Sequence, residues 1–149
     1  MAEYVYNAVQ AVQPSQNVLL QDSIPCNKGY VLHRNGSGLL TLRGAVNGCC
    51  KSLARYQVTF NGNIAVPTGG TVQPIAVALS INGEALQTSR AIVTPAAVED
   101  YFNVTSTAYI TVPRGCCFNV AVENVPATDT EPAVAIDVQN ANLVVQRVA

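Results

Sequence analysis

The sequence predicts an all-β protein folded as a two-sheet antiparallel sandwich. Apolar and polar residues alternate over many short runs, the period expected of half-buried strands. Turn-forming stretches with Asn-Gly, Gly-Gly or Pro separate these runs at short intervals. The chain has 149 residues, a typical length for one domain. We therefore expect many short strands in a single sandwich.

The first segment, residues 1–15, is apolar and ends just after Pro14. We interpret it as a short N-terminal arm that extends from the sandwich and packs on a neighbouring molecule. Tyr4, Val5, Tyr6 and Val9 are its candidate docking residues. Residues 16–149 form the compact domain in this interpretation.

The apolar runs that follow give the expected strands in order. Tyr56, Val58 and Phe60 alternate with polar neighbours, for example, and Asn82-Gly83 is a strong hairpin signal. The best helix candidate, residues 95–101, is at most one turn long. The expected strands are residues 16–20, 30–34, 39–43, 54–61, 74–81, 87–93, 100–112, 117–124, 133–138 and 142–148.

Charged residues make up only 11% of the chain, whereas hydrophobic residues make up 49%. The usual charged share is about 25%. Such depletion of charge is typical of surfaces buried between subunits, so we favour an oligomer over a monomer with a neutral polar surface. A net charge of −1 and scattered basic residues argue against nucleic acid as a partner.

Neither a signal peptide nor a membrane helix is predicted. The N-terminal residues lack a positive region followed by a continuous apolar run. Residues 56–83 are uncharged, but polar residues, Pro and paired Gly interrupt them. We expect a soluble protein that is made in the cytoplasm and has no membrane partner.

The five cysteines form two adjacent pairs, Cys49-Cys50 and Cys116-Cys117, and a single Cys26. The strands that follow the two pairs are expected to begin at the same end of the sandwich, which would bring the pairs together. Three interpretations stay open: disulfides between the two loops, free thiols, and a metal site. The metal site is disfavoured because zinc ligands are usually separated by two to four residues.

Other candidate chemical groups favour no enzyme. His33 is the only histidine, and it lies in an apolar run. The acidic pairs Glu99-Asp100 and Asp129 with Glu131 fit solvated turns better than acid–base catalysis or a calcium site. The chain has no phosphate-binding loop and no G-x-S-x-G sequence. We expect no catalytic activity, no cofactor and no metal.

Residues 30–149 resemble the tumour-necrosis-factor-like jelly roll, the family that includes the globular heads of complement proteins. The resemblance rests on four local patterns and covers most of the chain. It implies a jelly-roll fold, and it implies homotrimers, because domains of this family usually form tight trimers around an apolar axis. The patterns are LTLRG followed by RYQVTFNGNI, PIAVALSINGEAL, STAYITVPRG leading into CCFNVAVEN, and the closing ANLVVQRVA.

The combination of arm and compact head resembles small phage capsid decoration or head-fibre proteins. The resemblance implies a structural virion protein that is made in the host cytoplasm and acts by self-assembly and docking. Its partners would be other copies of itself and a major capsid protein. The alternative is a binding head on a bacterial or spore surface that recognises glycans or proteins.

Overall fold

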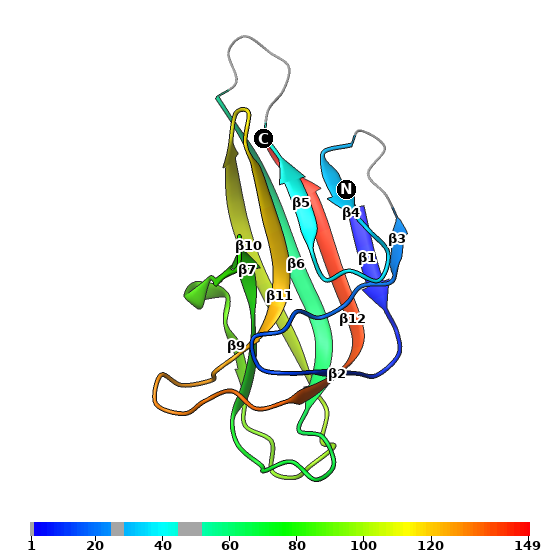
Figure 1. The fold of residues 1–149 in the computed structure, drawn as a ribbon, viewed down its shortest axis with the longest axis vertical. Helices are drawn as coiled ribbons and strands as arrows, with labels where there is room; N and C mark the ends of the chain where they lie inside the picture. Colours follow the sequence, from blue (N-terminus) through cyan, green and yellow to red (C-terminus); the bar gives the residue numbers. More distant parts are fainter. Residues whose placement is uncertain (1, 25–28, 45–51) are drawn as a thin grey trace.

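The computed structural model describes residues 2–24, 29–44 and 52–149, and it consists of two six-stranded antiparallel sheets (Figure 1). Sheet A has the strand order β10 (Phe102–Pro113), β6 (Leu53–Ala65), β12 (Ile136–Arg147), β1 (Ala2–Tyr6) and β3 (Asp22–Ile24), with β2 (Gln10–Val12) also paired to β12. Sheet B has the order β4 (Val31–His33), β5 (Leu40–Arg43), β11 (Cys117–Val125), β7 (Ile75–Ile81) and β8 (Glu84–Ala85), with β9 (Ala91–Val93) also paired to β7. The predicted two-sheet antiparallel sandwich is confirmed.

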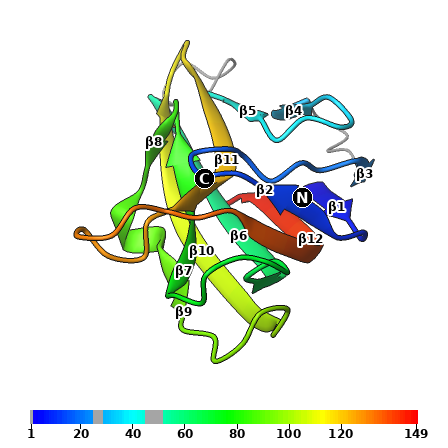
Figure 2. The same ribbon diagram turned by 60° about the horizontal axis from the view of Figure 1, so that its bottom comes forward.

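The hydrophobic core fills the space between the sheets, which Figure 2 shows as two layers, β4 and β5 in one and β1 and β12 in the other. Strand β6 contributes Tyr56, Val58 and Phe60, the alternation seen in the sequence, and all three are fully buried. Leu79 of β7 and Leu143 of β12 are also fully buried, one from each sheet. Burying a side chain of this size stabilises the fold by about 1.5–3 kcal/mol.

The N-terminal residues do not form an arm that leaves the sandwich, contrary to our expectation. Residues 2–6 are strand β1, which lies inside sheet A between β12 and β3. Tyr4 is only 2% exposed and belongs to the core. The reason is the pattern of residues 2–6: Ala2 and Tyr4 face inward and pair with apolar residues of β12.

Other expected strands differ in extent from those observed. Residues 16–20 form only isolated bridges, Asn17 with Glu123 and Leu20 with Ser37. The strand expected at 87–93 begins with a short 3-10 turn, because the Ser89 side chain bonds to the Leu79 main chain. Residues 95–101 contain no helix.

The two strands expected at 133–138 and 142–148 are one strand, β12, whose pairing with β6 shifts between Gln139 and Asn142. Asn140 has a φ of 54° at this irregularity, the left-handed conformation that Asn tolerates better than most residues. The extra residue therefore bends the strand without ending it.

Two turns predicted from the sequence have the expected conformations. Asn82 and Gly83 join β7 to β8 with φ values of 52° and 86°, as a two-residue type I′ hairpin requires. Arg114 and Gly115 join β10 of sheet A to β11 of sheet B, and Cys116 N–H donates to the Pro113 carbonyl at 3.1 Å. Within the described residues, no helix is long and apolar enough to cross a membrane.

Candidate functional site

The outer face of sheet A is the broadest candidate surface of the protein. Its side chains alternate with the buried ones along four strands, and register places them in rows across the sheet. One such row joins Thr107 of β10, Thr59 of β6, Val144 of β12 and Glu3 of β1. The face consists of Glu3, Val5, Leu53, Arg55, Gln57, Thr59, Asn61, Asn63, Asn103, Thr105, Thr107, Tyr109, Thr111, Asp137, Gln139, Asn142, Val144, Gln146 and Val148, which follows β12.

Neutral hydrogen-bonding side chains dominate the lower half of this face. Asn103 Nδ2 donates to Asn61 Oδ1 at 2.9 Å and to Asn63 Oδ1 at 3.2 Å, and Thr105 Oγ1 donates to Asn61 Oδ1 at 3.2 Å. The hydroxyls of Thr59 and Thr107 are 3.2 Å apart across β6 and β10. These cross-strand bonds hold the side chains flat against the sheet.

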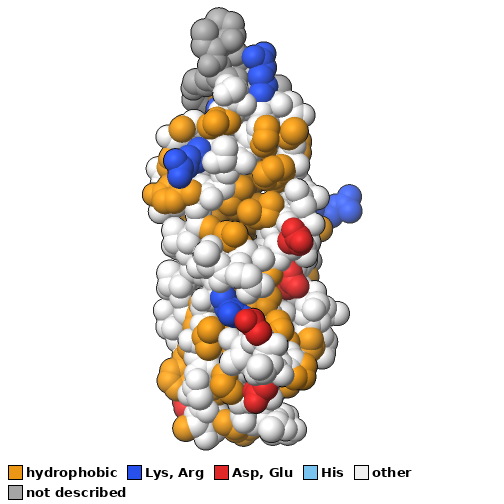
Figure 3. Space-filling model, turned by 90° about the vertical axis from the view of Figure 1, so that its left-hand side faces the viewer, with side chains coloured by type: hydrophobic (Ala, Val, Ile, Leu, Met, Phe, Trp, Pro, Cys, Tyr) orange, Lys and Arg blue, Asp and Glu red, His pale blue; other side chains and the backbone are white. Residues whose placement is uncertain are grey.

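The upper half of the face is more apolar. Tyr109 is 55% exposed, and Leu53 and Val148 are 43% and 45% exposed. The Arg55 guanidinium lies 4.9 Å from the centre of the Tyr109 ring, a cation–π contact. Figure 3 shows a different side, the edge of the sandwich on the left of Figure 1 where β10 and β7 lie, and its upper part also carries more hydrophobic than charged side chains.

The charged members of this face on its four strands are Glu3, Arg55 and Asp137, which pairs with Ala65 of β6. Asn142 Nδ2 donates to Glu3 Oε1 at 2.6 Å, and Arg55 lies over Tyr109. The other side chains of the face are neutral, so another surface can cover them without burying further charges. Tyr and Arg are also the residue types that most often anchor protein interfaces.

The predicted docking residues Tyr4, Val5, Tyr6 and Val9 do not form one surface. Tyr4 is buried, Val5 lies on the outer face of sheet A, and Tyr6 packs against the core. Val9, 48% exposed, follows β1 in the turn that leads to β2. Tyr4 is thus unavailable for docking.

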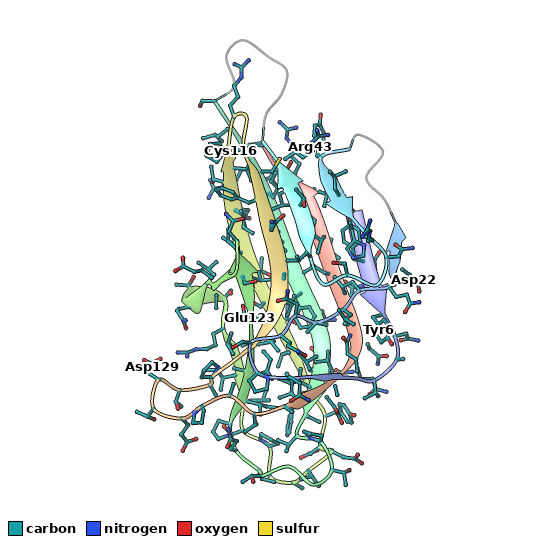
Figure 4. All side chains as sticks on the ribbon, viewed as in Figure 1. Tyr6, Asp22, Arg43, Cys116, Glu123 and Asp129 are labelled. Carbon is teal, nitrogen blue, oxygen red and sulfur yellow. The ribbon has the colours of Figure 1, made fainter. Side chains whose placement is uncertain are left out.

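The described cysteines, Cys116 and Cys117, are both exposed at the end of the β10–β11 turn (Figure 4). Cys49 and Cys50 lie outside the described residues, as does Cys26. The described residues that flank Cys49 and Cys50 reach this turn: Gly44 N–H donates to the Cys116 carbonyl at 2.9 Å, and the Ser52 carbonyl accepts from Arg114 N–H at 2.9 Å. The inter-loop disulfide or thiol cluster stays a prediction.

His33 has a structural environment. Its Nε2 lies 2.9 Å from the Ser37 carbonyl, so this nitrogen carries the donated hydrogen. Its ring lies 4.6 Å from the Tyr4 ring, and its Nδ1 is buried with no hydrogen-bond partner. These contacts of His33 with the Ser37 carbonyl and the Tyr4 ring include no nucleophilic side chain that the histidine could activate.

The acidic residues of the two predicted pairs do not gather at one site. Asp129 forms an ion pair with Arg90 at 3.6 Å, whereas Glu99 accepts a hydrogen bond from Thr68. Glu99 lies near Asp137: burial, followed by the Glu99 charge, raises the pKa of the Asp137 carboxyl. Within residues 2–24, 29–44 and 52–149, no group of three His, Cys, Asp or Glu side chains is placed to hold a metal ion.

Comparisons with known proteins show the fold. No family model matches the chain, and no curated protein matches it. The globular domain of zebrafish complement 1qA protein is similar in structure, with a TM-score of 0.57 and 14% identity, over 96% of this chain and 94% of that one. Eiger TNF from S. frugiperda is similar with a TM-score of 0.63 and 12% identity, over 100% of this chain and 92% of that one. The predicted tumour-necrosis-factor-like jelly roll is confirmed as the fold.

Sequence reasoning missed the outer face of sheet A as a site. Its residues were visible only as the polar members of alternating runs, which are usually solvated. The signal that could have found it is the number of Thr, Asn and Gln residues, instead of Lys and Glu, at alternate positions of residues 53–63 and 103–111.

Proposed function

We propose that this protein is a structural assembly protein that forms a homotrimer through the outer face of sheet A. The observation that carries the proposal is the composition of this face, which spans four strands and has only Glu3, Arg55 and Asp137 as charged members. Tyr109 is its most exposed large hydrophobic side chain. The trimer is the arrangement that the family resemblance implies.

The composition of the face also changes the expected mechanism. Instead of a purely apolar axis, contact would combine an aromatic and aliphatic upper half with a lower half of Asn and Thr side chains. A polar contact of this kind fixes the relative position of subunits, because a misplaced partner leaves amides without hydrogen-bond partners. Tyr109 and Arg55 would supply the anchor.

Thr107→Arg tests the assembly surface. Thr107 is exposed near the middle of the face, so an arginine there would place a charge in the contact of every subunit. We expect the variant to sediment as a monomer while its thermal unfolding midpoint changes little. The control is Thr94→Arg, at an exposed position after β9 that is not on this face, which should keep the wild-type mass. A trimeric Thr107→Arg protein would contradict the proposed surface.

The larger structure to which the trimer attaches is, in our proposal, a phage capsid. Support comes from the resemblance of the chain to small decoration or head-fibre proteins. Co-sedimentation of the protein with assembled particles, and its loss from particles when its gene is deleted, are the expected results. Recovery from a bacterial or spore surface instead would favour the alternative, a surface binding head.

A further inference from the structure

A groove of exposed leucines lies on the opposite side of the sandwich from the outer face of sheet A. It consists of two neighbouring hollows, of about 390 and 350 Å³, which share Leu39. Leu19 lines the first hollow and Leu32 the second. The three leucines are 45–49% exposed, an unusual gathering of large aliphatic side chains at a surface with so many polar residues.

The walls of this leucine groove are fixed by hydrogen bonds. The Gln10 side chain bonds twice to the Leu19 main chain, donating to its carbonyl at 3.0 Å and accepting from its N–H at 2.8 Å. Ser37 Oγ accepts from Leu39 N–H at 3.1 Å, and the Ser37 carbonyl bonds to His33. A groove held in this way loses little conformational freedom when a partner fills it.

The charge at the leucine groove is positive and unpaired. Arg34 lines the second hollow, and Arg43 is exposed on β5, two residues from Thr41, which also lines it. Neither arginine forms an ion pair within the described residues, where Arg90 pairs with Asp129. No acidic side chain lines either hollow. The groove is therefore complementary to an apolar segment that carries a carboxylate.

We propose that the leucine groove docks an extended, acidic and aliphatic segment of a partner protein. An extended segment directs every second side chain to one face, so two successive apolar side chains can enter the two hollows. Aspartate or glutamate residues between or beside them would meet Arg34 and Arg43. This inference does not depend on the proposed trimer. A trimer formed through the outer face of sheet A would leave the leucine groove accessible, because the groove lies on the opposite side of the sandwich.

A methyl NMR titration of the leucine-labelled full chain tests the proposal. The probe is a short acetylated and amidated peptide in which leucine alternates with aspartate, and the matched peptide has lysine in place of aspartate. We expect shifts at the methyls of Leu19, Leu32 and Leu39 with the aspartate peptide. Its affinity should exceed that of the lysine peptide by about threefold or more, as expected for one or two exposed ion pairs.

Two variants separate the apolar from the charged contribution. Leu39→Ser should abolish the shifts, whereas Ile92→Ser, at a 49% exposed residue of β9 outside the groove, should leave them unchanged. Arg34→Glu should reverse the preference between the two peptides. The proposal is overturned by the absence of groove shifts, by equal affinity for both peptides, or by groove shifts that depend on protein concentration alone, which would identify a second copy as the occupant. The solution mass of the same samples reports on the trimer separately.

Discussion

At the scale of single residues, Asn124 connects parts of the fold that are far apart in sequence. It is 1% exposed on β11, and its Nδ2 donates to the carbonyls of Val12 at 3.0 Å and Val134 at 2.7 Å. It therefore ties β11 of sheet B to β2 and to the segment just before β12. Sequence reasoning placed Asn124 only in a strand, because the partners of a buried amide depend on tertiary structure.

Asn124→Ala is expected to destabilise the protein by about 2 kcal/mol or more, since it leaves two main-chain carbonyls without their donor. Urea unfolding of the wild type and the variant measures this loss. The control, Asn119→Ala, removes a solvent-exposed bond to Thr41 and should cost less than about 1 kcal/mol. Equal losses for the two variants would contradict the role given to Asn124.

Glu123 is a second residue whose behaviour follows from its surroundings. It is half-buried on β11, and burial raises the pKa of its carboxyl. The folded protein therefore holds this proton more tightly than the unfolded chain does. Between the ordinary pKa and the raised one, the unfolded state binds fewer protons, so the stability of the fold decreases as the pH rises.

Glu123→Gln removes the free-energy cost of holding a charged carboxylate at this half-buried position. We expect the variant to unfold at a higher temperature than the wild type at pH 7, with a difference that shrinks as the pH falls below the ordinary range of a glutamate. Thermal unfolding across this pH range measures the difference. Glu131→Gln, at an exposed loop residue, is the matched control and should show a smaller effect. A wild type more stable than Glu123→Gln at pH 7 would be inconsistent with the burial effect.

At the scale of elements, the β7–β8 hairpin depends on two consecutive left-handed residues. Gly83 has a φ of 86°, and a Cβ added there would meet no atom within 4 Å. Gly83→Ala therefore isolates the conformational cost, which we expect to be about 1–2 kcal/mol. Thermal or urea unfolding checks it, with Glu84→Ala as an exposed neighbouring control. A neutral Gly83→Ala would mean that the hairpin adopts another turn.

The β10–β11 turn carries Cys116 and Cys117 at an exposed end of the sandwich. Iodoacetamide should modify both thiols rapidly in the reduced, folded protein. In protein purified without reductant, peptide mapping determines whether either is joined to Cys49 or Cys50. Five alkylated cysteines in that sample would exclude the inter-loop disulfides predicted from the sequence.

How far the sequence predicts an element depends on whether its hydrogen bonds and burial are local. Strands β6 and β10 alternate clearly, whereas residues 75–80 of β7 are all buried, and the turns after β7 and β10 are indicated by Asn82-Gly83 and by Gly115. Strand β1 was not predicted, because its five residues become a strand only through pairing with β12, more than a hundred residues away. The same holds for residues 16–20, whose hydrogen bonds go to β11 and to Ser37.

At the scale of the whole molecule, the neutral side chains that give the chain its low content of charged residues gather on one face. The outer face of sheet A consists mainly of neutral amides, hydroxyls and exposed apolar side chains, whereas Arg43 lies on β5 of the other sheet and Arg34 directly follows β4. The low content of charged residues in the sequence predicts that copies of the chain associate, but it does not indicate which face they use. That information resides in the register of β10, β6, β12 and β1, which aligns polar residues from distant segments.

The proposed function depends on self-association through the outer face of sheet A. The most direct measurement is the mass of the wild-type protein in solution by light scattering at micromolar concentration. We predict a single species of about three times the 15.7 kDa chain mass, under reducing conditions as well. A species of 15.7 kDa over the whole concentration range would contradict the proposed assembly.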